Sequence, residues 1–367
     1  MRFVFWQRCI SIHQNALLNA LAKRHTVTLV VEQEIHQERI SEGWEIPKLK
    51  HISIITAPDK QEILELIKRE KNAEHIVSGI DTVFKPYHLI SLLNNYGVKP
   101  HIYAEPYNPS GFSGFIRFTK YSLLALKYRN KIGAFLATGK LGVCCYKKVG
   151  FPAECLFEWG YFTEIQAVSI LEQKTSKLPK LIYIGKLDKR KNVHALLEIC
   201  SKHAEKYMEL TVIGRGPEEL FLKTISSRAK LKFFGTVPHE NIYKHLLSSD
   251  ILILPSLFDG WGAVVNEALQ CGCRVITSDH CGAASLINSL SKGSVFPLKK
   301  GSLSLESAIL AEIDKGIQSP AKRNSLIEWT KKTISGEAAA NYLEEIITTY
   351  NNKNSAMQII PPWDKYK

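Results

Sequence analysis

The chain has 367 residues, of which 45% are hydrophobic and 23% are charged, and its formal net charge is +13. This composition is that of a globular protein, and the length favours two domains. No apolar run reaches the length of a transmembrane helix and the N-terminus lacks a signal-peptide pattern, so a cytoplasmic protein is expected. The eight cysteines form no C-x-x-C pair, which favours reduced thiols over a zinc site.

Strand-like apolar runs alternate with helical segments in the first half, the pattern of a parallel α/β sheet. The expected strands are Phe3–Trp6, Val27–Val31, Ile52–Thr56, His75–Ser78, His101–Ala104 and Ala134–Ala137. The expected helices are Ser11–Lys23, Gln61–Lys71, Lys85–Asn95 and Phe115–Lys131.

The second half repeats this alternation. Its expected strands are Leu181–Ile184, Leu210–Ile213, Leu231–Phe234, Ile251–Leu254 and Val275–Thr277. Its expected helices are Val193–Glu205, Glu218–Ser227, Glu240–Ser248, Ala263–Gln270 and Ala283–Ser289. The polar stretch Thr163–Pro179 marks the boundary, so we expect domains at 1–162 and 163–350 and a tail at 351–367 that could return to the N-terminal domain.

Two carboxylates eight residues apart, Asp259 and Glu267, stand in the segment PSLFDGWGAVVNEAL. The apolar run before them predicts a buried strand, the Gly-Trp-Gly turn ends it, and a helix is expected from Ala263 to Gln270. Asp259 then precedes a helix N-terminus, where backbone N–H groups favour polar or anionic ligands. Glu267 is expected about two turns along that helix, roughly 12 Å further. Acids so far apart suit two parts of one extended ligand.

This segment resembles the E-x7-E signature of retaining glycosyltransferases of family 4, which have the two-domain GT-B architecture. The preceding Pro-Ser and the following Cys271-Gly272-Cys273 add to the resemblance, which covers most of Leu181–Leu286 and the first half only loosely. Asp259 stands where the family usually has Glu and so reaches less far. The resemblance implies an α/β protein with two Rossmann-like domains facing each other across a cleft. The alternative is a strand–loop–helix junction with two solvated acids.

Further segments of the second half resemble the family's donor site. The loop after the strand Leu181–Ile184 holds Lys186, Arg190 and Lys191, and the resemblance implies that these cations hold the donor diphosphate. Fixed cations there stabilise the charge that a departing diphosphate gains. The alternative is a basic surface loop. The other donor-binding candidates are Gly214, Gly216, Pro238, Gly260, Trp261 and Gly262.

The first half supplies two further catalytic candidates. The loop after its first strand contains no Gly, although the family often has a Gly-rich loop there. Ser11 is expected to cap the following helix, which places His13 in the first turn, facing the expected cleft. Glu105 follows a later strand and could bind an acceptor hydroxyl, orient a partner or pair with a neighbouring Lys. A structural role is the alternative for His13.

Residues 101–150 hold eight basic residues and one acid, Glu105. No nucleic-acid-binding motif accompanies them, so no nucleic-acid partner is expected. The segment Phe115–Lys131 carries basic residues at helical spacing beside apolar ones, which favours peripheral docking on an anionic membrane at its inner face. A solvated face on a sheet-packing helix is the alternative.

The resemblance implies a hexosyltransferase-like, metal-independent enzyme that moves a sugar from a nucleotide-diphosphate sugar, with UDP or GDP, to a glycan or lipid-linked acceptor. Glu267 would hold the ribose hydroxyls and Asp259 would position the sugar, and no cofactor or metal is required beyond the nucleotide sugar. The product would belong to capsule, exopolysaccharide or lipopolysaccharide biosynthesis. The alternatives are another GT-B enzyme, such as a nucleotide-sugar epimerase or phosphorylase, and a non-catalytic nucleotide-binding scaffold.

Overall fold

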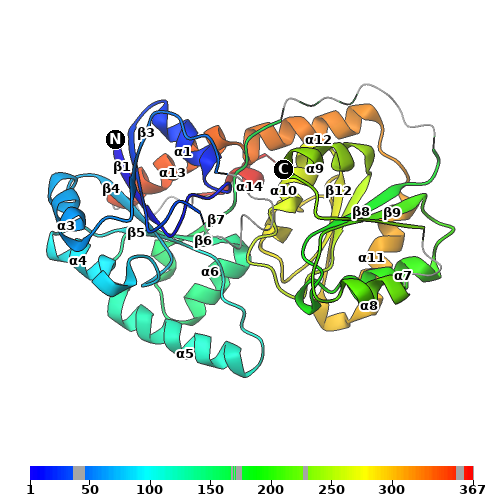
Figure 1. The fold of residues 1–367 in the computed structure, drawn as a ribbon, viewed down its shortest axis with the longest axis horizontal. Helices are drawn as coiled ribbons and strands as arrows, with labels where there is room; N and C mark the ends of the chain where they lie inside the picture. The colour runs from blue at the N-terminus through cyan, green and yellow to red at the C-terminus, as the bar shows by residue number, and fades with distance from the viewer. Residues whose placement is uncertain are drawn as a thin grey trace. The chain divides into compact units, whose positions relative to one another are not determined.

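The computed structural model describes residues 1–35, 46–166, 168, 170, 176–225, 230–352 and 359–366. These residues form two compact units, each built on one parallel sheet (Figure 1). Unit 1 contains the described parts of residues 1–164 together with Ile334–Lys365, and unit 2 contains those of Ile165–Thr333 with Tyr366. Parts of three predictions lie outside the described residues: 226–227 of a helix, 167, 169 and 171–175 of the boundary, and 353–358 and 367 of the tail.

The sheet of unit 1 has seven strands in the order β3-β2-β1-β4-β5-β6-β7. The strands are β1 (Arg2–Gln7), β2 (Thr26–Val31), β3 (Ile52–Thr56), β4 (Glu74–Ser78), β5 (His101–Ala104), β6 (Phe135–Thr138) and β7 (Leu156–Trp159). The helices are α1 (Asn15–Ala22), α3 (Lys60–Arg69), α4 (Leu89–Asn95), α5 (Gly111–Tyr128), α6 (Gly139–Lys148), α13 (Gly336–Asn351) and α14 (Pro362–Lys365).

The sheet of unit 2 has six strands in the order β10-β9-β8-β11-β12-β13. The strands are β8 (Lys180–Ile184), β9 (Glu209–Ile213), β10 (Leu231–Gly235), β11 (Ile251–Leu254), β12 (Arg274–Ser278) and β13 (Gly293–Phe296). The helices are α7 (Val193–Lys202), α8 (Glu219–Ile225), α9 (His239–Ser248), α10 (Val264–Gln270), α11 (Ser302–Asp314) and α12 (Pro320–Thr333). Both units are therefore Rossmann-like, and the predicted α/β architecture is confirmed.

The central strands form the cores because they are apolar on both faces, as parallel sheets with helices on both sides require. All four residues of β11 are fully buried, and in β1 only the first residue is exposed. Strand order reverses between β1 and β4 in unit 1 and between β8 and β11 in unit 2. Ligands of such open sheets bind at the carboxyl ends of the strands beside this reversal. The fold thus singles out the loops after β1, β4, β8 and β11.

The chain returns to unit 1 after α12, because α13 packs against α1. A Cβ at Gly336 would lie 2.2 Å from the Ala16 carbonyl oxygen, so the start of α13 is in close backbone contact with α1. The ring of Tyr342 stacks on Trp159 at 5.4 Å, and its hydroxyl donates to the Glu158 carbonyl. The structure therefore divides the chain differently from the predicted 163–350 domain, which included α13.

Some local predictions were wrong. The helix expected at Ala283–Ser289 is a short 3-10 helix, Gly282–Leu286, and α10 begins one residue later than expected. Ser11 does not cap α1, which begins at Asn15 with Gln14 at the cap position and no side-chain cap. The Ser11 hydroxyl instead accepts from the His13 backbone N–H, so His13 lies in the turn before α1. The sequence analysis also missed β7, β13, α6, α11 and α12.

Candidate functional site

The loops after β8 and β11 are in direct contact, since these two strands are neighbours at the strand-order reversal of unit 2. The Leu257 N–H donates to the Arg190 carbonyl at 2.8 Å, and the Arg190 guanidinium donates to the Phe258 carbonyl at 3.0 Å. Asn192 adds a hydrogen bond to the Pro255 carbonyl. Segments almost seventy residues apart in sequence thus form one loop pair at the position where open α/β sheets bind ligands.

Lys191 and Asp259 form an ion pair within this loop pair, in which Lys191 Nζ donates to Asp259 Oδ2. Each side chain is only 12% exposed. The Asp259 backbone is fixed on both sides, because its N–H donates to the His280 carbonyl and its carbonyl accepts from the Gly282 N–H. The resemblance gave the two side chains separate ligand groups, whereas the structure brings the charges together. This pairing was not visible in the sequence.

Glu267 lies in the first turn of α10 and not two turns along a helix as expected. Glu267 Oε1 is 3.0 Å from His239 Nε2, and the residue is 8% exposed. The hydrogen bond to Glu267 raises the pKa of His239, against the lowering effect of burial. His239 directly follows Pro238, the residue at the cap position of α9. The predicted candidates Glu267 and Pro238 therefore meet at His239, which the sequence analysis did not select.

The two glycines after β9 hold the loop of Lys186 in place. A Cβ at Gly214 would lie 1.9 Å from the Gly185 carbonyl oxygen, and one at Gly216 would lie 2.2 Å from the Leu187 carbonyl oxygen. Only glycine permits so close a backbone approach. The Leu187 N–H also donates to the Arg215 carbonyl. Both glycines thus have a packing role that is independent of any ligand, while Lys186 itself is exposed.

The Gly260-Trp261-Gly262 turn belongs largely to the core. Trp261 is 1% exposed, and its indole N–H donates to Asn266 Oδ1 at 2.8 Å. Gly262 has a φ of +92°, and a Cβ there would lie 2.9 Å from Cys281 Sγ. A Cβ on Gly282 would lie even closer, 2.2 Å from the Gly260 carbonyl oxygen. The tryptophan side chain is therefore structural, and only backbone groups of this turn remain as donor-binding candidates.

The candidates of unit 1, His13 and Glu105, both contact Tyr161. The His13 and Tyr161 rings stack with centroids 4.6 Å apart, and the Tyr161 hydroxyl donates to Glu105 Oε1. Burial, followed by the neighbouring Tyr103 and Glu105, raises the pKa of Tyr161, so the phenol remains a donor. Glu105 directly follows the last residue of β5, and Tyr161 lies two residues after the end of β7. Tyr161 was not among the predicted site residues, although a polar aromatic residue just after a terminal strand could have indicated this role.

Residues 169–333 match the family described as "Glycosyl transferases group 1". The matched segment lies within unit 2 and covers less than half of the chain. The amylovoran biosynthesis glycosyltransferase AmsK of Erwinia amylovora is 30% identical over 37% of this chain and 36% of its own length. The chain thus spans about a third of this curated relative.

Solved structures extend the likeness in fold to the whole chain. HepE of Anabaena, solved in complex with UDP, has a TM-score of 0.69 at 12% identity and covers 95% of this chain and 100% of its own. The lipopolysaccharide outer core galactosyltransferase WaaB has a TM-score of 0.66 at 14% identity, covering 95% of this chain and 99% of its own. At such identities the likeness establishes the GT-B type of fold for the group 1 segment and for unit 1 alike.

Proposed function

We propose that this protein is a retaining glycosyltransferase that moves a sugar from a nucleotide-diphosphate sugar to a glycan or lipid-linked acceptor in surface polysaccharide synthesis. The observation that carries the proposal is the loop pair after β8 and β11. It places Lys186, Arg190, Lys191 and Asp259 at the strand-order reversal of unit 2. Metal independence remains part of this proposal. The printed names of AmsK and WaaB, which concern amylovoran and lipopolysaccharide, support the product class.

Lys186, Arg190 and Lys191 of the loop after β8 would bind the donor diphosphate. As the glycosidic bond breaks, the leaving group gains negative charge, so fixed cations stabilise the transition state more than the ground state. Lys191 is held by Asp259 within a nearly buried environment, where its charge is less screened than at the surface. Lys186 and Arg190 are exposed. The Arg190 guanidinium would have to release the Phe258 carbonyl before it could contact a ligand. Asp259 would then position both the lysine and the sugar hydroxyls.

The second carboxylate would bind the ribose. Glu267 accepts a hydrogen bond from His239 and is fixed by it, which leaves further lone pairs of the carboxylate for two hydroxyl groups. Pro238 precedes this histidine and would contact the base through backbone atoms. A UDP-sugar is the first donor to test, because HepE, which has the same type of fold, was solved with UDP and with UDP-glucose.

The test is donor binding and turnover with UDP-glucose, UDP-galactose and GDP-mannose, measured by calorimetry and by release of the nucleoside diphosphate. Glu267→Gln is expected to weaken nucleotide affinity about tenfold or more, since a hydrogen bond to a charged group contributes about 1.5–3 kcal/mol. Lys191→Met is expected to lower turnover more than affinity. Lys189→Met, an exposed lysine of the same loop, is the matched control and should behave as the wild type.

Each other outcome has a defined meaning. Nucleotide binding without turnover on any acceptor extract would favour the scaffold. Donor conversion that needs no acceptor would favour an epimerase, and conversion that needs phosphate would favour a phosphorylase. Equal affinity and turnover in all three variants would refute the site assignment.

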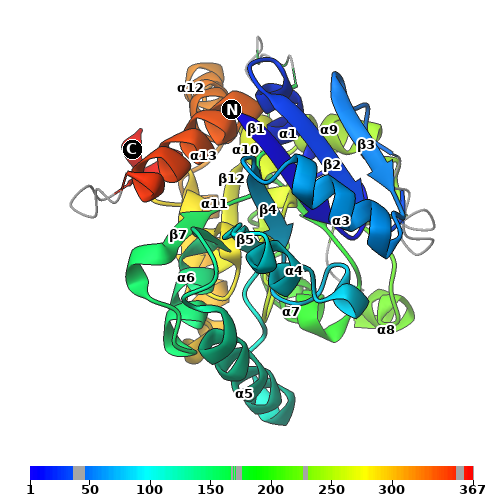
Figure 2. The same ribbon diagram turned by 90° about the vertical axis from the view of Figure 1, so that its left-hand side faces the viewer.

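We further propose that α5 docks on an anionic membrane, where a lipid-linked acceptor would lie. Five apolar side chains of this helix recur at helical spacing and are between 53% and 80% exposed: Phe112, Phe115, Ile116, Leu123 and Leu126. The opposite face of α5 is the one that packs on unit 1, through Gly114, Ala125 and Tyr128. Figure 2 shows α5 projecting beyond the sheet of unit 1. A stripe this exposed departs from the apolar-inside pattern of an ordinary sheet-packing helix.

Charge indicates what would cover this stripe. Arg117, Lys120 and Lys127 flank it and are exposed, and each cation near an anionic surface contributes about 1 kcal/mol to binding. No helix in the described part of the chain is long and apolar enough to span a membrane. An interfacial helix with apolar residues on one face and cations beside them is the arrangement that lies in the headgroup region.

Vesicle flotation tests the docking. We expect retention on vesicles of phosphatidylcholine with phosphatidylglycerol, and little on phosphatidylcholine alone. Phe115→Ser with Leu126→Ser should abolish retention, whereas Leu303→Ser, an equally exposed leucine on α11, should leave it unchanged. Retention that does not depend on the anionic lipid or on the double substitution would refute the proposal.

A further inference from the structure

Unit 2 contains a cavity away from the loop pair after β8 and β11. A cavity of about 550 Å³ opens beside Arg274, the first residue of β12. Because the strands of this sheet are parallel, the amino end of β12 lies at the sheet edge opposite to the strand ends that carry Lys191 and Asp259. The cavity lies within unit 2 alone, between the segment before β13, the end of α11 and the helix α12.

The lining of this cavity is rich in cations and hydrogen-bond donors. Four of its side chains are positively charged, and no carboxylate is among the described residues that line it. The cationic residues are Arg274, Lys292, Lys315 and Lys322, the polar ones are Ser289, Ser291, Ser325 and Gln318, and the apolar ones are Leu290, Ile317, Leu326 and Trp329. Such a lining attracts an anion with a polar body that can also contact an aromatic ring.

One buried acid balances only part of this charge. Glu312 is fully buried beneath the cavity, and its carboxylate is 3.3 Å from Arg274 and 2.6 Å from Lys315. Lys292 is 3% exposed, and its ammonium lies 3.8 Å from the ring centroid of Trp329 and 2.5 Å from Asn288 Oδ1. Neither the ring nor the amide oxygen carries a negative charge that would offset that of the lysine. The local charge therefore remains positive.

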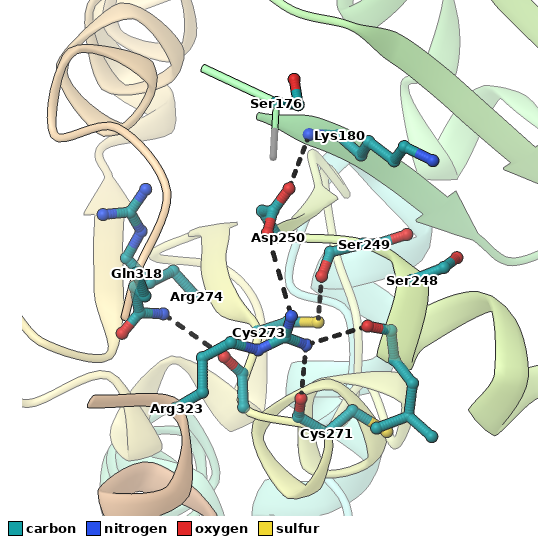
Figure 3. Close-up of polar contacts among 12 residues, drawn as sticks. Ser176, Lys180, Ser248, Ser249, Asp250, Cys271, Cys273, Arg274, Gln318 and Arg323 are labelled. Carbon is teal, nitrogen blue, oxygen red and sulfur yellow. Dashed lines mark hydrogen bonds and ion pairs between the residues drawn. The ribbon is translucent and has the colours of Figure 1, made fainter. Parts of the chain in front are cut away.

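The wall formed by α12 is fixed. Arg323 of this helix donates to the Cys271 carbonyl at 2.8 Å and lies 3.9 Å from the Asp250 carboxylate (Figure 3). It also donates to the Leu247 carbonyl at 3.2 Å. Gln318 donates to the Gly272 carbonyl at 3.3 Å. The indole N–H of Trp329 donates to the Tyr366 carbonyl at 2.6 Å. A ligand entering the cavity would thus meet a preorganised wall and would lose little free energy to ordering it.

We propose that this cavity binds a sugar phosphate. Lys292 and Lys315, whose ammonium groups are held by contacts within unit 2, would bind the phosphate together with the exposed Lys322, because charge-assisted hydrogen bonds recognise it. The serine hydroxyls and the Gln318 amide would bind sugar hydroxyls, and Trp329 would contact the apolar edge of the sugar ring. The volume exceeds what inorganic phosphate alone would fill and lies within the range of ordinary small-molecule sites. The proposal does not depend on the transferase activity.

Isothermal titration of the full chain with glucose 6-phosphate, glucose and inorganic phosphate at low ionic strength tests this site. We expect saturable binding of glucose 6-phosphate, binding of phosphate that is about tenfold weaker, and none of glucose at concentrations up to about 10 mM. Lys322→Glu, at an exposed position, should weaken glucose 6-phosphate binding about tenfold or more, while Lys322→Arg should retain it within about twofold. Lys299→Glu, an exposed lysine outside the lining, is the control.

Three results would overturn the proposal: no heat with any probe, equal affinity in Lys322→Glu and Lys299→Glu, or loss of binding in Lys191→Met but not in Lys322→Glu. The last would place the sugar phosphate at the β8 and β11 loops. Circular dichroism of each variant shows that the fold is retained.

Discussion

The loops at the carboxyl ends of the two sheets both carry candidate charged groups, but different contacts hold them. In unit 2 the contacts are between charges and between backbones: Lys191 with Asp259, Glu267 with His239, and glycine turns against carbonyls. In unit 1 an aromatic ring holds the candidate residues: Tyr161 stacks on His13, and its hydroxyl donates to Glu105. A site held by ion pairs loses stability when one partner is removed, because the other charge is left without its counter-charge. A site held by ring stacking tolerates the loss of a polar atom as long as the stacked ring remains.

The largest expected effect comes from breaking the ion pair of unit 2. Lys191→Met should lower the free energy of unfolding by about 3 kcal/mol, because it leaves the Asp259 carboxylate nearly buried without its cation. Urea denaturation measures the change. Lys189→Met should change it by less than about 0.5 kcal/mol, since that lysine is exposed.

A double substitution distinguishes the loss of the counter-charge from the loss of packing by the lysine side chain. Lys191→Met with Asp259→Asn should recover most of the lost stability, because no uncompensated charge then remains. If the double variant is as unstable as Lys191→Met alone, the loss of stability comes from packing of the lysine stem. The ion pair then does not hold this loop pair of unit 2 together.

The backbone contacts of unit 2 should come next. Gly216→Ala is expected to cost about 2 kcal/mol, because its Cβ would lie 2.2 Å from the Leu187 carbonyl oxygen and the loop of Lys186 must move. Gly316→Ala is the control, with a φ of +68° but no atom within 4 Å of its Cβ, and should cost about 1 kcal/mol from backbone strain alone. Equal costs in thermal or urea unfolding would show that the two loops are not closely packed.

Unit 1 should respond less. Tyr161→Phe removes the hydroxyl bonded to Glu105 but keeps the ring on His13, so we expect a loss of about 1 kcal/mol. Tyr161→Ala also removes the stacked ring and should cost distinctly more. The melting temperatures of the two variants show whether the ring or the hydroxyl of Tyr161 contributes more to stability. Were the Phe variant as unstable as the Ala variant, the hydrogen bond would be the main contact, and the contrast between the units would disappear.

The sequence predicted those features that depend on local pattern. Apolar runs predicted most of the strands within a residue or two, since buried parallel strands are nearly continuous in Val, Ile and Leu. It missed β7 and β13, whose partly exposed or glycine-containing segments lack that pattern. Return of α13 to unit 1 depends on a close approach at Gly336, which no local pattern reveals.

The site residues likewise divide into those that a local sequence pattern predicts and those that it does not. Asp259 and Glu267 were selected by their spacing, and Lys191 by the resemblance of its loop to the family's donor site. Their roles stay predictions. The pairings Lys191–Asp259 and Glu267–His239 join residues 68 and 28 positions apart, and they depend on how loops fold over that edge. The role of Tyr161 was missed for the same reason, since its partner Glu105 lies 56 residues earlier.

The smallest expected effect is the pH dependence of the Glu267–His239 pair. The pair raises the pKa of His239 above its ordinary value of 6.5, so the folded state holds the proton more tightly than the unfolded state. Its stabilisation is therefore fully present below about pH 6.5 and is lost as the pH rises through the raised pKa. Since the His239 side chain is 50% exposed, the effect should stay within about 1 kcal/mol.

The difference in unfolding free energy between the wild type and His239→Gln, measured from about pH 5.5 to 8.5, should shrink as the pH rises. Glu267→Gln should remove most of this dependence, because the neutral amide no longer favours the imidazolium. A difference that stays constant with pH would mean that His239 is neutral in the folded protein and donates from an uncharged ring. In that case Glu267 would have a purely geometric partner, and the contrast with the aromatic contacts of unit 1 would rest on the Lys191–Asp259 pair alone.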